Sequence, residues 1–149
     1  MTTIAYKDGI VAYDGRCLSN YDIISDVQDK CFSSKGVDFF VSGTIGDVDE
    51  FMDAYHNGLY YNKDLDIDIN CIIHDEGYLY HGYSHDGKIY KTKIDPGLLF
   101  AVGSGRDYAM AFMSAGKSAE EAVSSVMTLD CGTGGKIRVK HITDQGEKR

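Results

Sequence analysis

Residues 2–16, TTIAYKDGIVAYDGR, decide how the rest of the chain is interpreted. Two strand-like runs flank Lys7-Asp8-Gly9, and an Asp-Gly between such runs is a strong signal for a β-hairpin. We therefore expect strands over residues 2–7 and 10–17. Chain ends are usually loose, whereas a strand that begins at residue 2 or 3 would hold Thr2 in a fixed position. A fixed position would allow the hydroxyl and the α-amine of Thr2 to work together in a reaction.

The composition excludes several classes of protein. A chain of 149 residues with 43% hydrophobic residues predicts one core and a single domain over 1–149. The formal net charge of −8 argues against a nucleic-acid partner, because phosphate contacts need clustered Lys and Arg. The sequence contains neither a run of apolar residues long enough to span a membrane nor an export signal, so we expect a cytoplasmic protein without a membrane association.

The spacing of possible metal ligands does not favour a metal site. The cysteines are too far apart in sequence for a zinc knuckle, and we expect them to be reduced thiols. Three histidines fall on neighbouring predicted strands, but no carboxylate pattern completes a ligand set around His74, His81 and His85. We predict neither a metal nor any other cofactor.

Three helices are predicted from periodicity and capping signals. In the first, over residues 47–58, Asp47 and Glu50 have the offset of a capping box, and Gly58 ends the helix. The second begins near Ser104 and the third at Ser118, where Glu121 gives another capping-box offset. The side chains expected to be buried are Val48, Phe51, Met52 and Tyr55 in the first helix, Tyr108, Ala111, Phe112 and Ala115 in the second, and Ala119, Ala122, Val123 and Val126 in the third.

Further strands are predicted between and after these helices. They are the run 36–43, the hairpin strands 69–74, 78–83 and 88–94, the run 98–105 and the last strand 134–142. Residues 143–149 form a polar tail. Helices beside antiparallel strands indicate a layered α+β domain.

Short polar residues stand at the ends of several predicted strands. Strand ends on one side of a sheet can converge on one site. The residues in such positions are Thr2, Asp14, Gly43, Ser104, Asp130 and Thr133.

Five segments, in this order, resemble the N-terminal-nucleophile (Ntn) hydrolases of the proteasome β-subunit type, and most of all the short bacterial and phage relatives of the HslV peptidase. The resemblance extends from Thr2 to about Ile142. It rests on the start TTIAYKDGIVAYDGR, on Lys30 placed 16 residues after Asp14, on VSGTIGD (41–47), on AVGSGRDYAMAFM (101–113) and on DCGTGG (130–135).

The resemblance implies a fold and a set of roles. The fold would be a four-layer αββα sandwich of reduced size. Thr2 would be the nucleophile after removal of Met1, and the small side chain of Thr2 favours that removal. The α-amine of Thr2 would be the general base. Asp14 would hold Lys30 charged beside Thr2, and the Gly43 N–H would stabilise the oxyanion. Ser104, Asp130 and Thr133 would orient the amine, while Arg16, Leu18 and Ile45 would contact the substrate.

Two functions remain open at this stage. The first is a threonine peptidase that hydrolyses peptides or unfolded proteins inside a closed homo-oligomeric ring, with an AAA+ ATPase as a possible partner. The second is an inactive scaffold of the same fold, for example a phage-encoded protein that binds or inhibits a host protein or a small molecule in the host cytoplasm. The two differ in whether Met1 is removed and whether Thr2 reacts.

Overall fold

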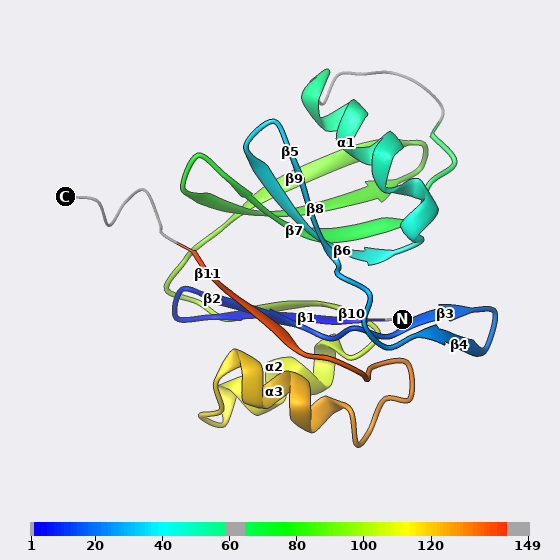
Figure 1. The fold of residues 1–149 in the computed structure, drawn as a ribbon. Coiled ribbons are helices and arrows are strands. Elements are labelled where there is room, and N and C mark those ends of the chain that lie inside the picture. The colour runs from blue at the N-terminus through cyan, green and yellow to red at the C-terminus, as the bar shows by residue number, and fades with distance from the viewer. Residues whose placement is uncertain (1, 59–64, 143–149) are drawn as a thin grey trace.

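The computed structural model describes residues 2–58 and 65–142. Figure 1 shows four layers, which are helix α1, a five-stranded sheet, a four-stranded sheet and the helix pair α2 and α3. The predicted α+β class and its four-layer αββα arrangement are confirmed. The predicted tail, 143–149, lies outside the described residues.

The four-stranded sheet contains the opening segment of the chain. Its strands are β1 (Thr3–Lys7), β2 (Ile10–Tyr13), β10 (Phe100–Gly103) and β11 (Arg138–His141), in the order β10-β1-β2-β11 with antiparallel neighbours. The β1–β2 hairpin is confirmed, because Asp8 and Gly9 both take the positive φ angles that a two-residue hairpin turn requires. Strand β1 is flanked on both sides, so Thr2 is attached to the middle of the sheet.

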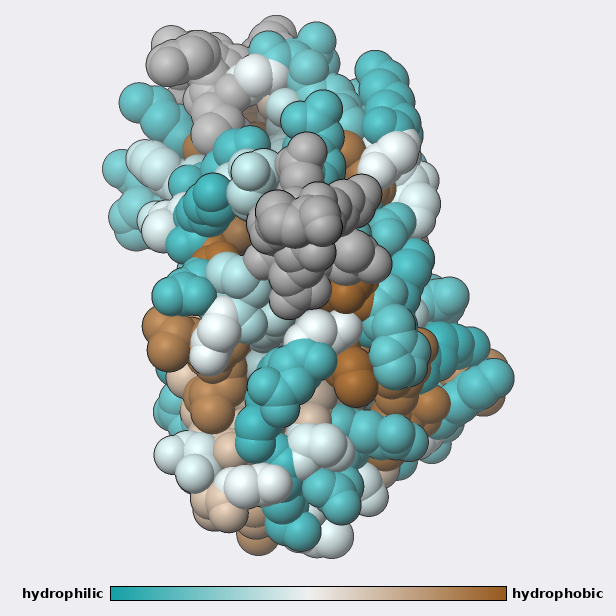
Figure 2. Space-filling view, turned by 90° about the vertical axis from the view of Figure 1, so that its left-hand side faces the viewer, coloured by the Kyte–Doolittle hydropathy of each residue, from teal (hydrophilic) through white to brown (hydrophobic). Residues whose placement is uncertain are grey.

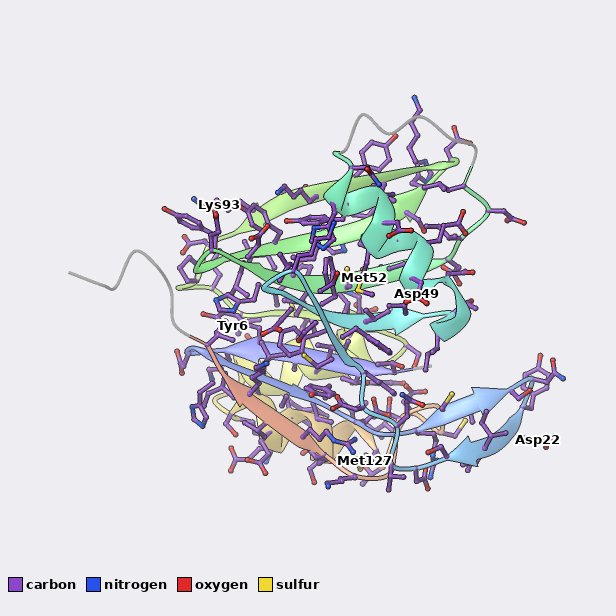
Figure 3. All side chains as sticks on the ribbon, turned by 45° about the horizontal axis from the view of Figure 1, so that its top comes forward. Tyr6, Asp22, Asp49, Met52, Lys93 and Met127 are labelled. Carbon is purple, nitrogen blue, oxygen red and sulfur yellow. The ribbon has the colours of Figure 1, made fainter. Side chains whose placement is uncertain are left out.

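A separate hairpin follows β2, which ends at Tyr13 rather than at residue 17 as predicted. Strands β3 (Cys17–Ser19) and β4 (Asp22–Ser25) pair only with each other among the described strands. Figures 1 and 3 show this hairpin projecting from the sandwich, with Asp22 near its outer end. After this hairpin the chain enters the edge strand of the five-stranded sheet, over residues 31–34.

The five-stranded sheet is a meander of antiparallel strands. In spatial order, these are β5 (Cys31–Ser34), β6 (Val37–Gly43), β7 (Ile69–Asp75), β8 (Tyr78–His85) and β9 (Lys88–Ile94). The predicted strands 36–43, 69–74, 78–83 and 88–94 are confirmed, with small differences in their bounds.

Helix α1 (Val48–His56) packs on the outer face of the five-stranded sheet, as predicted, through Val48 and Phe51. The capping box predicted for it is wrong. A 3₁₀ turn (η1, Ile45–Asp47) leads directly into α1, so Asp47 has a helical backbone and its side chain does not cap the helix. The Asp47 carboxylate instead accepts a hydrogen bond from the Asp68 N–H at 2.9 Å, which ties the start of α1 to the strand end before β7.

Helices α2 (Arg106–Ser114) and α3 (Ala119–Val126) cover the outer face of the four-stranded sheet. The capping box of Ser118 and Glu121 is confirmed, and so is the buried face of α3. The face predicted for α2 is wrong, because Tyr108, Ala111 and Ala115 are exposed and the fully buried residues are Ala109 and Met113. The sheet presents alanines to this helix, and small facing residues allow a close approach of the helix axis.

The space between the two sheets is filled by a second core. Figure 3 shows Tyr6 between the sheets and Met52 on the inner side of α1. Tyr6, Phe40, Ile72 and Val102 are among the residues buried there. On the face seen in Figure 2, hydrophobic surface lies in separate patches among hydrophilic residues. The polar residues discussed next lie at one end of the inter-sheet core, where β1 begins.

Replacing two alanines of α2 by leucine, one at a time, tests which face of the helix is buried. We expect Ala109→Leu to lower the free energy of unfolding by about 1–3 kcal/mol, because the larger side chain must fit against the sheet. Ala111→Leu is the matched control on the exposed face and should change it by less than about 0.5 kcal/mol. Urea unfolding followed by circular dichroism measures both, and an equal cost for the two would contradict this packing.

Candidate active site

Thr2 lies directly before β1 and is 4% exposed. Its Oγ1 accepts a hydrogen bond from Lys30 Nζ at 2.9 Å. Lys30 comes from the segment between β4 and β5, and its backbone carbonyl accepts from the Val41 N–H of β6. The five-stranded sheet therefore fixes the lysine, while the four-stranded sheet fixes the threonine.

Lys30 also forms a buried ion pair with Asp14, which follows β2. Lys30 Nζ is 2.8 Å from Asp14 Oδ1, and the two residues are 1% and 0% exposed. Three backbone N–H groups, those of Thr3, Arg16 and Gly134, donate to the same carboxylate. Burial lowers the pKa of Lys30, and the Asp14 charge opposes this shift. The carboxylate thus favours an ammonium beside the Thr2 hydroxyl.

A second group of polar residues lies around the backbone nitrogen of Thr2. Thr2 N–H donates to Ser104 Oγ at 3.2 Å, and Ser104 Oγ donates to Asp130 Oδ2 at 2.6 Å. Thr133 Oγ1 donates to the same carboxylate oxygen at 2.7 Å. Burial raises the pKa of Asp130, but hydrogen bonds from Ser104, Thr133 and Gly132 outweigh it and keep that pKa below its ordinary value.

Ser104 is not the N-cap of α2. That position belongs to Gly105, which has no side chain that could cap the helix. The Ser104 hydroxyl instead accepts a hydrogen bond from the Thr2 nitrogen and donates one to Asp130. The sequence-based hypothesis was that Ser104, Asp130 and Thr133 all orient the amine. In the structure Ser104 contacts the Thr2 nitrogen directly, and Asp130 and Thr133 lie behind Ser104.

Gly43 ends β6 in a conformation that favours glycine. Its φ is +116°, and a Cβ there would lie 2.2 Å from the Asp68 carbonyl oxygen. Thr44 N–H donates to Asp68 O on the β7 side, whereas Val41 N–H donates to Lys30 O on the β5 side. Because N–H directions alternate along a strand, the Gly43 N–H lies on the same side as that of Val41, towards Lys30.

A cleft of about 670 Å³ opens beside these groups. Leu18 and Ile45, two of the residues predicted to contact substrate, line it together with Ile24 of the projecting hairpin. Arg16 also lines it, but its guanidinium forms a bidentate pair with Asp26 and donates to the Cys131 carbonyl. These contacts tie Arg16 to Asp26 at the base of the hairpin and to the segment around Cys131.

The sequence motifs did not predict several residues that lie at this site. Thr3 is 0% exposed, and its Oγ1 lies 2.7 Å from Thr133 Oγ1. Asn70 and Arg106 line the cleft from β7 and α2. Alternation in β1 could have indicated a buried Thr3, whereas no local pattern points to Asn70 or Arg106.

The described part of the chain has no group of three or more His, Cys, Asp or Glu residues that could hold a metal ion. Among the described helices, none is long and apolar enough to cross a membrane.

Comparisons with solved structures identify the fold of this chain. The chain is similar to the structure of BPH from Thiobacillus denitrificans in complex with epoxomicin, with 18% identity, a TM-score of 0.66 and coverage of 95% of this chain and 98% of that one. It is also similar to eukaryotic HslV from Trypanosoma brucei, with 17% identity, a TM-score of 0.65 and the same coverage. The chain has the HslV-like Ntn-hydrolase fold.

The resemblance stated from sequence motifs is therefore confirmed at the level of the fold. No protein-family model and no curated protein matches the sequence. In the HslV-like fold of this chain, Thr2, Asp14, Lys30, Ser104, Asp130 and Thr133 form one connected set of hydrogen bonds, with Gly43 and the cleft beside it.

The buried ion pair gives a direct stability prediction. Lys30→Met should lower the free energy of unfolding at neutral pH by about 3–5 kcal/mol, because Asp14 would remain buried without its cation. The matched control is Lys140→Met in the more exposed pair with Asp38, which should cost less than about 1 kcal/mol.

The pairwise origin of this cost is tested by a double-mutant cycle. Asp14→Asn combined with Lys30→Met should cost clearly less than the sum of the two single variants, because the residues share one interaction. Denaturant unfolding of the four proteins measures the coupling, and additive costs would contradict a buried Asp14–Lys30 pair.

Proposed function

We propose that the protein is a threonine-type peptidase whose nucleophile is Thr2 after removal of Met1. The observation that carries the proposal is that both the hydroxyl and the backbone nitrogen of Thr2 are hydrogen-bonded to polar side chains of the site. Its hydroxyl accepts from a buried lysine at 2.9 Å, and its nitrogen donates to a serine at 3.2 Å that is bonded to a carboxylate. A hydroxyl needs a nearby base to act as a nucleophile, and a terminal threonine carries that base on its own α-carbon.

The reaction would begin with attack of Thr2 Oγ1 on a peptide carbonyl carbon. The hydroxyl proton passes to the α-amine, whose reference pKa of about 7.7–8 suits a general base near neutral pH. The Lys30 ammonium favours the neutral amine and stabilises the oxygen as it becomes negative. The C–N bond then breaks, the leaving amine takes the proton, and water hydrolyses the resulting ester of Thr2.

Gly43 is proposed to supply the oxyanion donor. The support is the alternation of N–H groups along β6, which turns this N–H towards the side of Lys30, and the presence of Gly43 and Thr2 on the same cleft. One such donor contributes about 2.7–4 kcal/mol in comparable enzymes. Leu18 and Ile45 would contact apolar side chains of the substrate.

The substrate class proposed is peptides and unfolded protein segments, and the proposed assembly is a closed homo-oligomeric ring with an AAA+ ATPase as a possible partner. These proposals rest on the likeness to HslV and add no residue to the site described above.

Reaction with an epoxyketone such as epoxomicin, the compound bound to BPH, tests the proposal. Such a reagent forms a ring with a hydroxyl and the free amine beside it, so an adduct requires both functions of a terminal Thr2. We expect one adduct per chain, mapped to Thr2 by peptide mass spectrometry. Thr2→Ala should form none, and Thr128→Ala, an exposed threonine, is the matched control that should react like the natural protein. An adduct that persists in Thr2→Ala, or none in a chain lacking Met1, would contradict the proposal and favour an inactive scaffold.

The pH dependence of peptide cleavage should be bell-shaped. Activity rises as the Thr2 amine loses its proton and falls as Lys30 loses its own. Because burial lowers the pKa of Lys30, the alkaline fall should occur below the reference lysine pKa of about 10.4. The logarithm of kcat/KM against pH measures both limbs, and a plateau that continues beyond this value would exclude the proposed role of the ammonium.

A further inference from the structure

Thr3 joins the two polar groups that contact Thr2. Its backbone N–H donates to Asp14 Oδ1 at 3.1 Å, on the side of Lys30. Its hydroxyl lies 2.7 Å from Thr133 Oγ1, on the side of Asp130. Thr3 is fully buried, and a buried hydroxyl is costly unless it is hydrogen-bonded. A valine would fill nearly the same space in a strand, so the hydroxyl of Thr3 calls for a reason.

The direction of each hydrogen bond follows from counting protons. The pKa of Asp130 stays below its ordinary value, so its carboxylate only accepts. Thr133 donates its single hydroxyl proton to Asp130 Oδ2 at 2.7 Å. The contact between Thr3 and Thr133 must therefore be a donation from Thr3, because Thr133 has no second proton.

The same count applies on the other side of Asp130. Ser104 lies 2.6 Å from Asp130 Oδ2 and 3.4 Å from the Thr2 carbonyl oxygen, so its proton goes to the carboxylate. Ser104 Oγ consequently faces the Thr2 nitrogen as an acceptor. A neutral amine at Thr2 would donate one N–H to Ser104 and keep its lone pair for the proton of its own hydroxyl.

The backbone is shaped around the Thr3 hydroxyl. A Cβ on Gly105 would lie 2.1 Å from Thr3 Oγ1, so the residue after Ser104 is in direct contact with that oxygen. Gly105 N–H also donates to the Thr2 carbonyl at 3.4 Å. Thr3 thus touches the segment that carries Ser104 and, through Thr133, the carboxylate that orients the Ser104 proton.

We infer that Thr3 is a positioning residue of the proposed peptidase. Its hydroxyl donates to Thr133 and so holds Thr133 Oγ1 against Asp130, the carboxylate that accepts the Ser104 proton and thereby leaves the Thr2 lone pair available. The inference rests on the proposed function of Thr2. Thr3 touches neither substrate nor the reacting atoms, so its loss should affect the chemical step and leave substrate binding unchanged.

Thr3→Val and Thr3→Ser, both made in the full chain, test this role. Thr3→Val keeps the shape and removes the hydroxyl, and we expect kcat and the rate of epoxyketone addition to fall about tenfold with KM unchanged, the scale of one neutral hydrogen bond. Thr3→Ser keeps the donor and should restore most of the rate. Thr92→Val, the same substitution on the exposed face of β9, is the matched control and should change neither value.

A double variant tests the path through Thr133. Thr133→Val alone should slow the reaction, and adding Thr3→Val should cause little further loss, because both changes interrupt one chain of hydrogen bonds. Thermal unfolding checks that each protein is folded, and Thr3→Ala replaces Thr3→Val should the valine prove unstable against Gly105.

The outcomes separate this inference from the proposed function. A fully active Thr3→Val protein, together with an inactive Thr2→Ala protein, would overturn the role of Thr3 and leave the peptidase intact. Multiplicative losses in the double variant, or a rise in KM alone, would overturn it as well. Retained activity in Thr2→Ala would instead overturn the proposed function itself.

Discussion

The buried ion pair between Lys30 and Asp14 is the constraint on which the site depends. An ammonium that is 1% exposed is costly to bury, and a carboxylate at 2.8 Å with three further backbone donors makes that burial possible. Replacing such a pair by apolar residues is often neutral or stabilising, so stability alone does not explain its presence beside extensive apolar cores. A fixed positive charge beside the Thr2 hydroxyl provides a reason.

The two sheets each supply half of this arrangement. The four-stranded sheet carries Thr2 and Thr3 at the start of β1, and Asp14 at the end of β2. The five-stranded sheet brings Lys30 from the segment before β5, and Gly43 at the end of β6. Because the inter-sheet core holds the layers together, the contact of Lys30 with Thr2 is a consequence of tertiary packing and exists in neither sheet alone.

Short-range rules account for most of what the sequence predicts correctly. The Asp-Gly turn of the first hairpin and the capping box of Ser118 and Glu121 are decided by residues next to each other in the chain, and both are present. The buried face of α2 could not be predicted in this way. The sequence of α2 carries apolar residues on more than one face. Packing against the alanines of the four-stranded sheet determines that Ala109, and not Ala111, is buried. Asp47 failed as a cap because a 3₁₀ turn continues into α1.

The candidate site follows the same division. The ends of strands and the spacing of motifs identified residues that the structure brings together, but not the order of their contacts. Thr133 contacts Thr3 directly, whereas Asp130 lies between Thr133 and Ser104. Thr3 and Thr133 are 130 positions apart in the chain, so no local sequence pattern could predict their contact. Arg16 was expected to contact the substrate. Its guanidinium pairs with Asp26, which follows the β3–β4 hairpin, and that hairpin was not predicted from the sequence.

The intact mass of the protein purified from cells that express it naturally tests the central claim most directly. The proposed chemistry requires a free α-amine on the residue whose hydroxyl faces Lys30, so the measured mass should equal that of the sequence without Met1. A mass that retains Met1 in the whole population would leave the Thr2 nitrogen in a peptide bond, and it would contradict the proposed chemistry.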